Sequence, residues 1–320
     1  MGVLGKGTQG ANWGTGSLDA TDIILRTMSA VKNKFGRESL QSNADEVPAI
    51  AFFMGNLIVS GSKEYAEAQY YNFPKLQPVD SNGDIVSRSK LKSMSTKFAM
   101  SKMASSLDIP DMDALAMTKA GTMEDIAMGI ASVNNQSVVD MCSYVCKNLY
   151  TGVLKAFGET PCLVNRPSGS VFVKDGVNLV PNMGALELSA ESLKYARQKL
   201  AMHKDLDGTN KSSGRPYLLI VDRRNIENAR DILSEIYKGD SNNPEIQFGG
   251  IQLACLDLDD EKDWLLVTDK AQFGFAVWSE TVMPSVFAYT ENENEEVHYI
   301  SKWYVEPYCL SPYGIFFSKF

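Results

Sequence analysis

One long amphipathic helix is the strongest constraint on how this chain can fold. Apolar residues recur three or four apart from Met123 to Tyr150, and this spacing predicts a helix. Thr122 and Asp125 resemble a capping box before it, and Gly152 stands where a C-terminal glycine belongs. At 1.5 Å per residue the helix would be about 40 Å long, well beyond the usual three turns. We therefore expect a spine that crosses an elongated domain. Its apolar face would carry Ile126, Ile130, Val133, Val138, Met141, Val145 and Leu149.

The region before this helix contains less apolar surface. Residues 1–16 hold six glycines and no apolar run, so they predict a mobile arm. Apolar residues spaced three and four apart predict a short helix from Ile24 to Phe35. From Ala49 to Val59 the residues are mostly apolar, and we expect this stretch to be extended.

The next segment predicts a hairpin that cannot bury itself. A long polar excursion ends in a turn at Asp80–Gly83, and apolar and polar residues then alternate from Met94 to Ser101, which is strand periodicity. Few large apolar residues are available to form a core there, so we expect a protruding hairpin that packs against something else. Residues 85–107 contain no acid and five bases, which are Arg88, Lys90, Lys92, Lys97 and Lys102.

Helices and strands alternate beyond the spine. The patterns predict a helix over Leu186–Met202, a buried strand over Tyr217–Val221 and an amphipathic helix over Asn225–Tyr237. Residues 264–320 hold 14 of the 31 aromatic residues, and aromatics favour strands. The order of hairpin, long helix, mixed middle and final strands predicts an α+β fold.

Composition excludes several classes of protein. The chain has 320 residues with 39 acidic and 31 basic side chains, a net charge of −8, which argues against a protein that coats nucleic acid. It has no apolar run of the length that a membrane helix needs and no signal-peptide pattern. Five scattered cysteines indicate reduced, buried thiols, and two histidines with no metal-ligand spacing indicate no structural metal. We expect a soluble intracellular or particle-borne protein without a cofactor.

Three short motifs suggest chemistry but lack its context. Gly5–Gly10 matches G-x-G-x-x-G, yet only four residues precede it and no helix-forming segment follows. Asp205–Gly208 resembles part of a calcium loop, but the register places His203 and Gly214 at the first and last ligand positions. A thiol nucleophile at Cys142 would need a nearby base; the chain has His203 and His298, but nothing in the sequence places either beside the thiol. A nucleotide- or thiol-dependent enzyme stays an alternative interpretation.

The basic hairpin has an acidic counterpart elsewhere in the chain. Residues 257–263 carry five acids, and residues 291–296 carry four. A basic hairpin that meets an acidic segment of a neighbouring copy accounts for both, although two solvated faces would as well. The candidate intersubunit residues are Arg88, Lys90, Lys92, Lys97, Lys102, Asp257, Asp259, Asp260, Glu261 and Asp263.

The order of local motifs in the second half resembles a known family. The motifs are Ala201–Gly208, Arg215–Val221, Ala229–Leu233, Asp263–Thr268 and Pro307–Gly314. Together they resemble the major capsid proteins of tailed bacteriophages with the Hong Kong 97-type fold, including those of Mu-like phages. The resemblance implies an N-terminal arm at 1–46, an extended loop at 47–107, and a peripheral domain at 108–155 with its spine helix at 122–151. A mainly axial domain at 156–262 and a strand-rich return at 263–320 would complete the subunit.

The resemblance also implies a function. Many copies would assemble as hexamers and pentamers into an icosahedral shell, in the host bacterial cytoplasm, and would enclose double-stranded DNA in the virion without reading its sequence. Separate scaffolding, portal and decoration proteins are possible partners, since no charged coiled-coil segment that could act as a fused scaffold precedes the arm. An encapsulin-like compartment is an alternative with the same fold.

Overall fold

The computed structural model describes most of the chain from residue 45 onward. The described residues are 45–71, 92–110, 123–156, 160–161, 163, 172–206, 208–238, 250–282, 284–291 and 296–320. The expected arm at 1–46, except for Asp45 and Glu46, therefore lies outside them. So do the short helix at Ile24–Phe35 and the Gly5–Gly10 motif.

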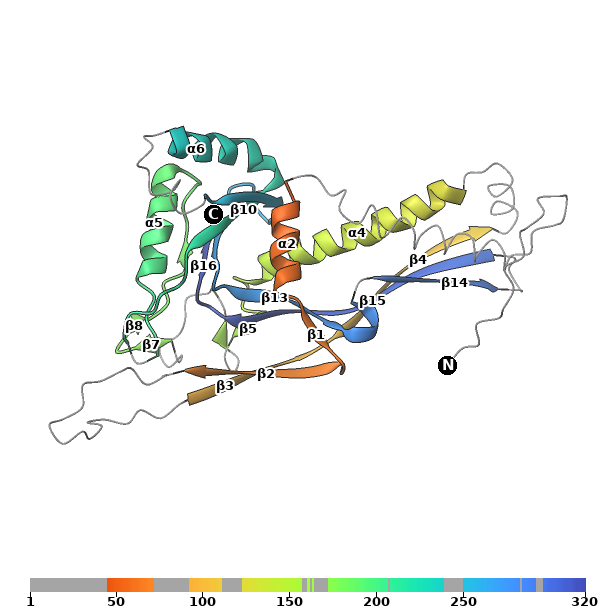
Figure 1. Cartoon of the computed structure of the whole chain (residues 1–320), viewed down its shortest axis with the longest axis horizontal. Helices are drawn as coiled ribbons and strands as arrows, with labels where there is room; N and C mark the ends of the chain where they lie inside the picture. Colours follow the sequence, from red (N-terminus) through yellow and green to blue (C-terminus); the bar gives the residue numbers. More distant parts are fainter. Residues whose placement is uncertain are drawn as a thin grey trace.

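One sheet forms the centre of the more compact part of the molecule (Figure 1). Its strand order is β11-β10-β12-β16-β9, in which β10 runs parallel to β11 and antiparallel to β12. The predicted strand at Tyr217–Val221 is confirmed as β10. The strands are β9 Met183–Gly184, β10 Pro216–Asp222, β11 Gln252–Leu256, β12 Trp264–Thr268 and β16 Ile315–Ser318.

Both faces of this sheet are buried, because side chains of a strand alternate between its faces. Leu218 and Ile220 of β10 join one apolar cluster, whereas Leu219 and Val221 join the other. On the second face lie α5 (Ala190–Ala201) and α6 (Ile226–Lys238), which confirm the two predicted helices. Ser189 caps α5 in a reciprocal pair with Ser192.

A second sheet runs along the elongated part of the molecule (Figure 1). Its long central strand is β15 (Glu296–Ser311). This strand pairs antiparallel with three others: β13 (Gln272–Trp278), β14 (Ser285–Glu291) and β4 (Ser101–Pro110). The short β1 (Ile58–Ser60) adds to β13 in parallel. The strand-rich final region that the aromatic residues predicted is confirmed.

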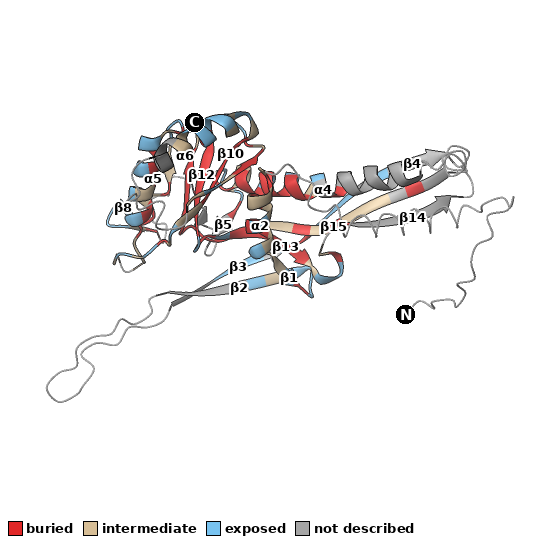
Figure 2. Cartoon of the chain, turned by 45° about the horizontal axis from the view of Figure 1, so that its top comes forward, coloured by how far each residue is buried: buried red, intermediate tan, exposed pale blue. Residues whose placement is uncertain are grey.

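The spine helix is confirmed as α4, Met123–Asn148, whose 26 residues span about 39 Å. Its C-terminal half is buried along one face (Figure 2), including the predicted Val138, Met141, Val145 and Leu149. Gly152, with φ +80°, belongs to the turn that follows. The side chains of Ile126, Ile130 and Val133 lie outside the described part of the chain.

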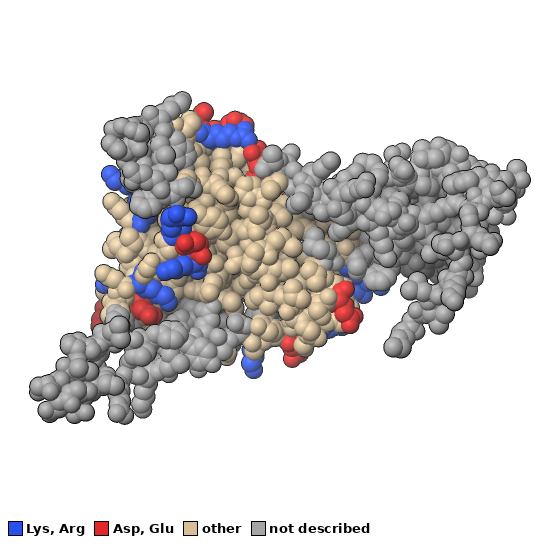
Figure 3. Space-filling view, viewed as in Figure 1, with Lys and Arg blue, Asp and Glu red and all other residues tan. Residues whose placement is uncertain are grey.

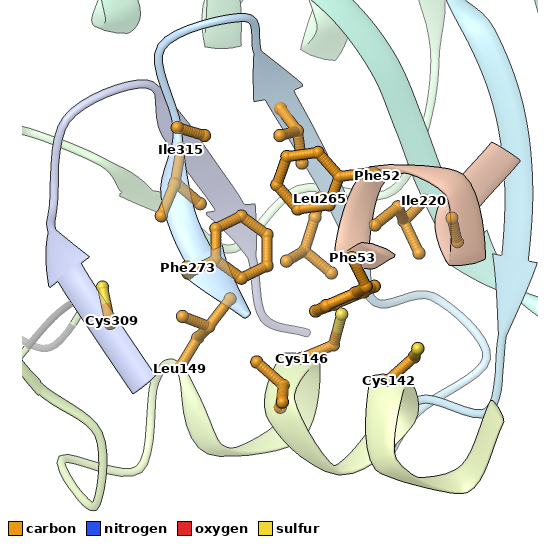
Figure 4. Packing of buried hydrophobic residues seen from close by; sticks show 14 of the residues in the cluster. Phe52, Phe53, Cys142, Cys146, Leu149, Ile220, Leu265, Phe273, Cys309 and Ile315 are labelled. Carbon is orange, nitrogen blue, oxygen red and sulfur yellow. The ribbon is translucent and has the colours of Figure 1, made fainter. Parts of the chain in front are cut away.

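The expectation of an extended stretch at Ala49–Val59 is wrong, because Val47–Gly55 forms the helix α2 and only Ile58–Ser60 is a strand. The run of apolar residues has no periodicity, and such a run suits a buried helix as well as a buried strand. Pro48 favours the first turn of a helix. Phe52 and Phe53 of α2 pack against Phe273, close to Cys146 of the spine (Figure 4).

A hairpin is present, formed by β2 (Glu64–Tyr71) paired antiparallel with β3 (Lys92–Ala99). Its second strand matches the predicted periodicity from Met94, but its first strand lies in the stretch expected as a polar excursion. The hairpin projects from the lower side of the body in Figure 1. Two further ribbons are short: β5 (Lys155–Ala156) with β6 (Thr160–Pro161), and β7 (Val173–Lys174) with β8 (Val177–Asn178). In the parts that the structure describes, no helix is long and apolar enough to span a membrane.

Candidate assembly surfaces

The basic residues predicted for the hairpin lie on two different elements. Lys97 is exposed on β3, and Lys102 is exposed on β4, where it pairs with Tyr304 of the second sheet. Lys92 begins β3. Arg88 and Lys90 lie outside the described residues. The basic strip is therefore part hairpin and part sheet edge.

The acidic segment at 257–263 forms the connection between β11 and β12. Its most buried member, Asp263, is fully enclosed and accepts hydrogen bonds from Lys319 Nζ at 2.6 Å and from the backbone amide of Phe320 at 2.9 Å. A carboxylate held in this way is part of the fold, because a buried charge needs its partner. Asp263 is therefore not available to face a neighbouring copy.

Two more acids of this segment have partners inside the chain. Asp257 lies 3.1 Å from Arg223, and Asp259 lies 3.6 Å from Lys319 and accepts a hydrogen bond from the Tyr150 hydroxyl. Glu261 is exposed, and Asp260 is half-buried. Among the described residues no ion pair joins this segment to Lys97 or Lys102. Asp259 is also exposed, whereas the Asp260 carboxylate accepts a 2.9 Å hydrogen bond from the Lys262 amide. Glu261 is consequently the acid of this segment most open to a neighbour.

A cluster of arginines that the sequence patterns did not single out fixes the point where the N-terminal region enters the body. Arg223 reaches the buried carboxylate of Glu46 at 2.8 Å, and Arg230 pairs with Asp45. The backbone amide of Cys255 donates a hydrogen bond to the carbonyl of Asp45. These contacts join residues 177 to 210 positions apart in the sequence, and local periodicity carries no signal for them.

An open cavity of about 1210 Å³ lies between the hairpin base, the C-terminal part of α4 and strand β15. Three large apolar side chains on its walls stay exposed: Met103, Tyr144 and Val153. Burial raises the pKa of Glu306 at its edge, and a hydrogen bond from Ser101 offsets only part of this rise. Contiguous exposed apolar groups of this kind mark contacts with other molecules.

Part of the molecular surface carries no charged side chains. On the face shown in Figure 3, Lys, Arg, Asp and Glu lie toward one end and along the margins, whereas the middle of this face carries none. An uncharged centre with a charged rim is typical of protein–protein contact surfaces.

The four cysteines that the structure describes are buried in the core. Cys142 and Cys146 face the apolar cluster from α4, as predicted, and burial raises the pKa of both thiols. Burial likewise raises the pKa of Cys255 to about 11. Cys309 is disulfide-bonded, so the expectation of five reduced cysteines is wrong at this position.

The remaining candidate motif is a turn. Gly208 donates its backbone amide to the carbonyl of Asp205 and adopts φ +88°, a conformation that favours glycine. Asp207 lies outside the described residues. Within the described ranges, no group of three or more His, Cys, Asp or Glu side chains is placed to hold a metal ion.

Comparison with known proteins finds solved structures that have a similar fold. No protein-family model and no curated protein matches the sequence. The capsid protein of cyanophage A-1(L) is similar in structure with a TM-score of 0.55 at 9% identity, covering 88% of this chain and 94% of that one. A protein of Microbacterium phage Oxtober96 gives a TM-score of 0.52 at 14% identity, covering 87% and 92%. The expected relationship to Mu-like phages stays a prediction, but the chain has the Hong Kong 97-type fold of phage capsid proteins.

Proposed function

We propose that the protein is the major shell subunit of a tailed bacteriophage. The observation that carries this proposal is a Hong Kong 97-type body with a projecting hairpin, none of whose described side chains in β2 and β3 is buried. An isolated two-stranded hairpin is at best marginally stable in water. Packing of the hairpin against another copy would supply the missing contacts, and repetition of one such head-to-tail contact closes a ring, the unit from which a shell is built.

The contact between copies would combine charge and apolar surface. Arg88, Lys90, Lys92, Lys97 and Lys102 would face Asp257, Asp259, Asp260 and Glu261 of a neighbour, and the exposed Glu261 would contribute most. The cavity walls at Met103, Tyr144 and Val153 would add apolar area to contacts between copies. Complementary charges of this kind set orientation and association rate more than affinity.

The finer parts of the proposal concern the assembled particle. Hexamers and pentamers would form an icosahedral shell around double-stranded DNA in the virion, after assembly in the host cytoplasm. Scaffolding, portal and decoration proteins would be separate chains. The subunit would have no enzymatic role and no cofactor.

Negative-stain electron microscopy of the native particle, combined with nuclease digestion, tests this proposal. We expect closed icosahedral shells that protect DNA from the nuclease. Shells that contain an enzyme cargo and no protected DNA would support the encapsulin-like alternative. A discrete monomer or dimer with catalytic turnover would contradict the proposal.

A further inference from the structure

Two short connecting segments join the hairpin to the sheet strands on either side of it: residues 61–63 form the outgoing crossing, and Met100 forms the return crossing. Strand β1 ends at Ser60, the chain turns, and β2 begins at Glu64; on the return, β3 ends at Ala99 and β4 begins at Ser101. These crossings lie side by side, because the amide of Met100 donates a 2.8 Å hydrogen bond to the carbonyl of Lys63. Contacts that hold these two crossings in place therefore also set the direction of the hairpin.

The return crossing is fixed by burial. The Met100 side chain is 8% exposed and packs in a small apolar cluster with Tyr308, Leu310 and Ala276. The turn of the outgoing crossing is held locally, since the Ser60 hydroxyl donates to the carbonyl of Ser62 at 2.8 Å. A Cβ at Gly61 would meet no atom within 4 Å, so the turn itself has open space around it.

The outgoing crossing is joined to the body by one charged side chain. The Lys63 ammonium lies 4.7 Å from the ring centroid of Tyr304 and 5.3 Å from that of Trp278. The two rings meet edge to face, with centroids 5.2 Å apart at 84°. Both separations are within the range of cation–π attraction, and the pair of rings presents two faces to one cation. Trp278 ends β13 and Tyr304 lies on β15, so Lys63 contacts two strands of the second sheet at once.

We propose that Lys63 is a positioning residue that sets the direction of the hairpin through its contact with Trp278 and Tyr304. Its backbone carbonyl ties the two crossings together, and its ammonium ties them to the sheet. Without the ammonium, the hairpin keeps its own strand pairing but swings more widely about the turn at residues 61–63. The consequence for assembly rests on the proposed shell function, whereas the positioning itself does not.

Hydrogen exchange of the unassembled full chain tests the positioning. Lys63→Met keeps the length of the side chain but removes the charge, and Lys63→Arg keeps a cation that can lie on the same rings. Loss of an exposed cation–π contact should raise exchange at the Met100 amide, whose hydrogen bond joins the two crossings, by about two- to fivefold in the Met variant. The amides of the hairpin's own strand pairs should keep their exchange rates. Exchange in the Arg variant should stay within about twofold of the wild type.

Lys199→Met is the matched control, because Lys199 lies 5.0 Å from the ring of Tyr195 on α5, far from the hairpin in sequence. This control should leave exchange at the Met100 amide unchanged. Unchanged exchange in Lys63→Met would overturn the proposal, as would equal increases in the Met and Arg variants.

Assembly gives a separate reading. If the wild type forms shells, Lys63→Met should slow shell formation at unchanged subunit stability, and Lys63→Arg should restore the rate. If the wild type forms no shells at all, the shell function fails, and the exchange result still decides the role of Lys63. Normal shell formation by Lys63→Met together with raised exchange would overturn the link between hairpin direction and assembly.

Discussion

At the scale of single residues, Gly314 makes the final turn possible. It has φ +78°, and a Cβ there would lie 2.4 Å from Thr268 Oγ1 and 2.9 Å from the amide of Ala271. Gly314→Ala should therefore lower the free energy of unfolding by at least about 2 kcal/mol, from the left-handed backbone and the steric overlap together. Urea unfolding followed by tryptophan fluorescence would measure this. Gly55→Ala is the control, because a Cβ at Gly55 meets nothing within 4 Å; equal losses in both variants would contradict the explanation.

Asp222 is a second residue whose role can be measured. It is buried at the end of β10 and accepts hydrogen bonds from the Arg224 amide at 2.9 Å and the Leu258 amide at 3.0 Å. Burial raises the pKa of Asp222. The hydrogen bonds from the Arg224 side chain and from these two amides lower the pKa by more than burial raises it, so the pKa lies below the usual value. Asp222→Asn should cost about 1–2 kcal/mol at pH 7, because the amide loses the ion pair with Arg224 and cannot accept hydrogen bonds at both positions.

The pH dependence of this effect has a definite sign. A carboxylate with a lowered pKa stabilises the fold fully above its unfolded-state pKa of about 4, and this contribution is lost as the pH falls through the lower folded-state value. The stability difference between wild type and Asp222→Asn should thus shrink between pH 5 and pH 2, measured by urea unfolding at each pH. Asn228→Ala, at an exposed position on α6, removes no carboxylate and should show no such trend. A difference that grows in acid would refute this assignment.

At the scale of elements, α2 shows where sequence patterns stop being informative. Its residues are apolar on every side, because α4 lies against one side and strands of both sheets lie against others. Period 3.6 is visible only when one face of a helix meets water, as in α5 and α6, which the sequence did predict. The same reasoning explains β10, whose unbroken apolar run identified a strand buried on both faces.

Because α2 packs between the sheets and the spine, its aromatic side chains should carry much of the stability. Phe53 is fully buried and lies 5.6 Å from Phe273 and 6.0 Å from Phe275, measured between ring centroids. Phe53→Ala should cost about 3–5 kcal/mol. Val59→Ala, at a position 51% exposed, should change stability by less than about 0.5 kcal/mol in the same denaturation experiment. A loss below 1 kcal/mol at Phe53 would show that the site collapses around the cavity.

At the scale of the whole molecule, the class, the spine and the hairpin could be predicted, but the long-range partners could not. Asp263 belongs to an acidic run in the sequence, and only the three-dimensional fold brings Lys319 to it. Arg223 and Glu46 meet in the same way. Charge counts along a chain identify candidate surfaces, and they do not reveal which charges the fold neutralises internally.

The proposed contact between copies makes a prediction at this largest scale. One exposed ion pair contributes only about 0.2–1 kcal/mol, so Lys97→Glu alone should be tolerated. Because the same contact repeats throughout a shell, the triple change of Lys90, Lys92 and Lys97 to Glu should leave the subunit folded but block shell closure. Circular dichroism would report folding, and light scattering would report assembly. Raised salt should slow wild-type assembly, since exposed charges are screened over about 8–10 Å at physiological ionic strength.

A charge exchange distinguishes a specific contact from a general effect of net charge. The triple change of Lys194, Lys199 and Lys270 to Glu alters net charge equally on α5 and in the turn after β12, and it should assemble normally. Changing Asp260 and Glu261 to Lys in the hairpin variant should restore part of the assembly rate, because opposite charges would again face each other across the contact. If the hairpin triple variant builds normal shells at the normal rate, the basic strip is only a solvated face. If both triple variants fail equally, repulsion from added net charge explains the loss and the contact between hairpin and acidic segment is wrong.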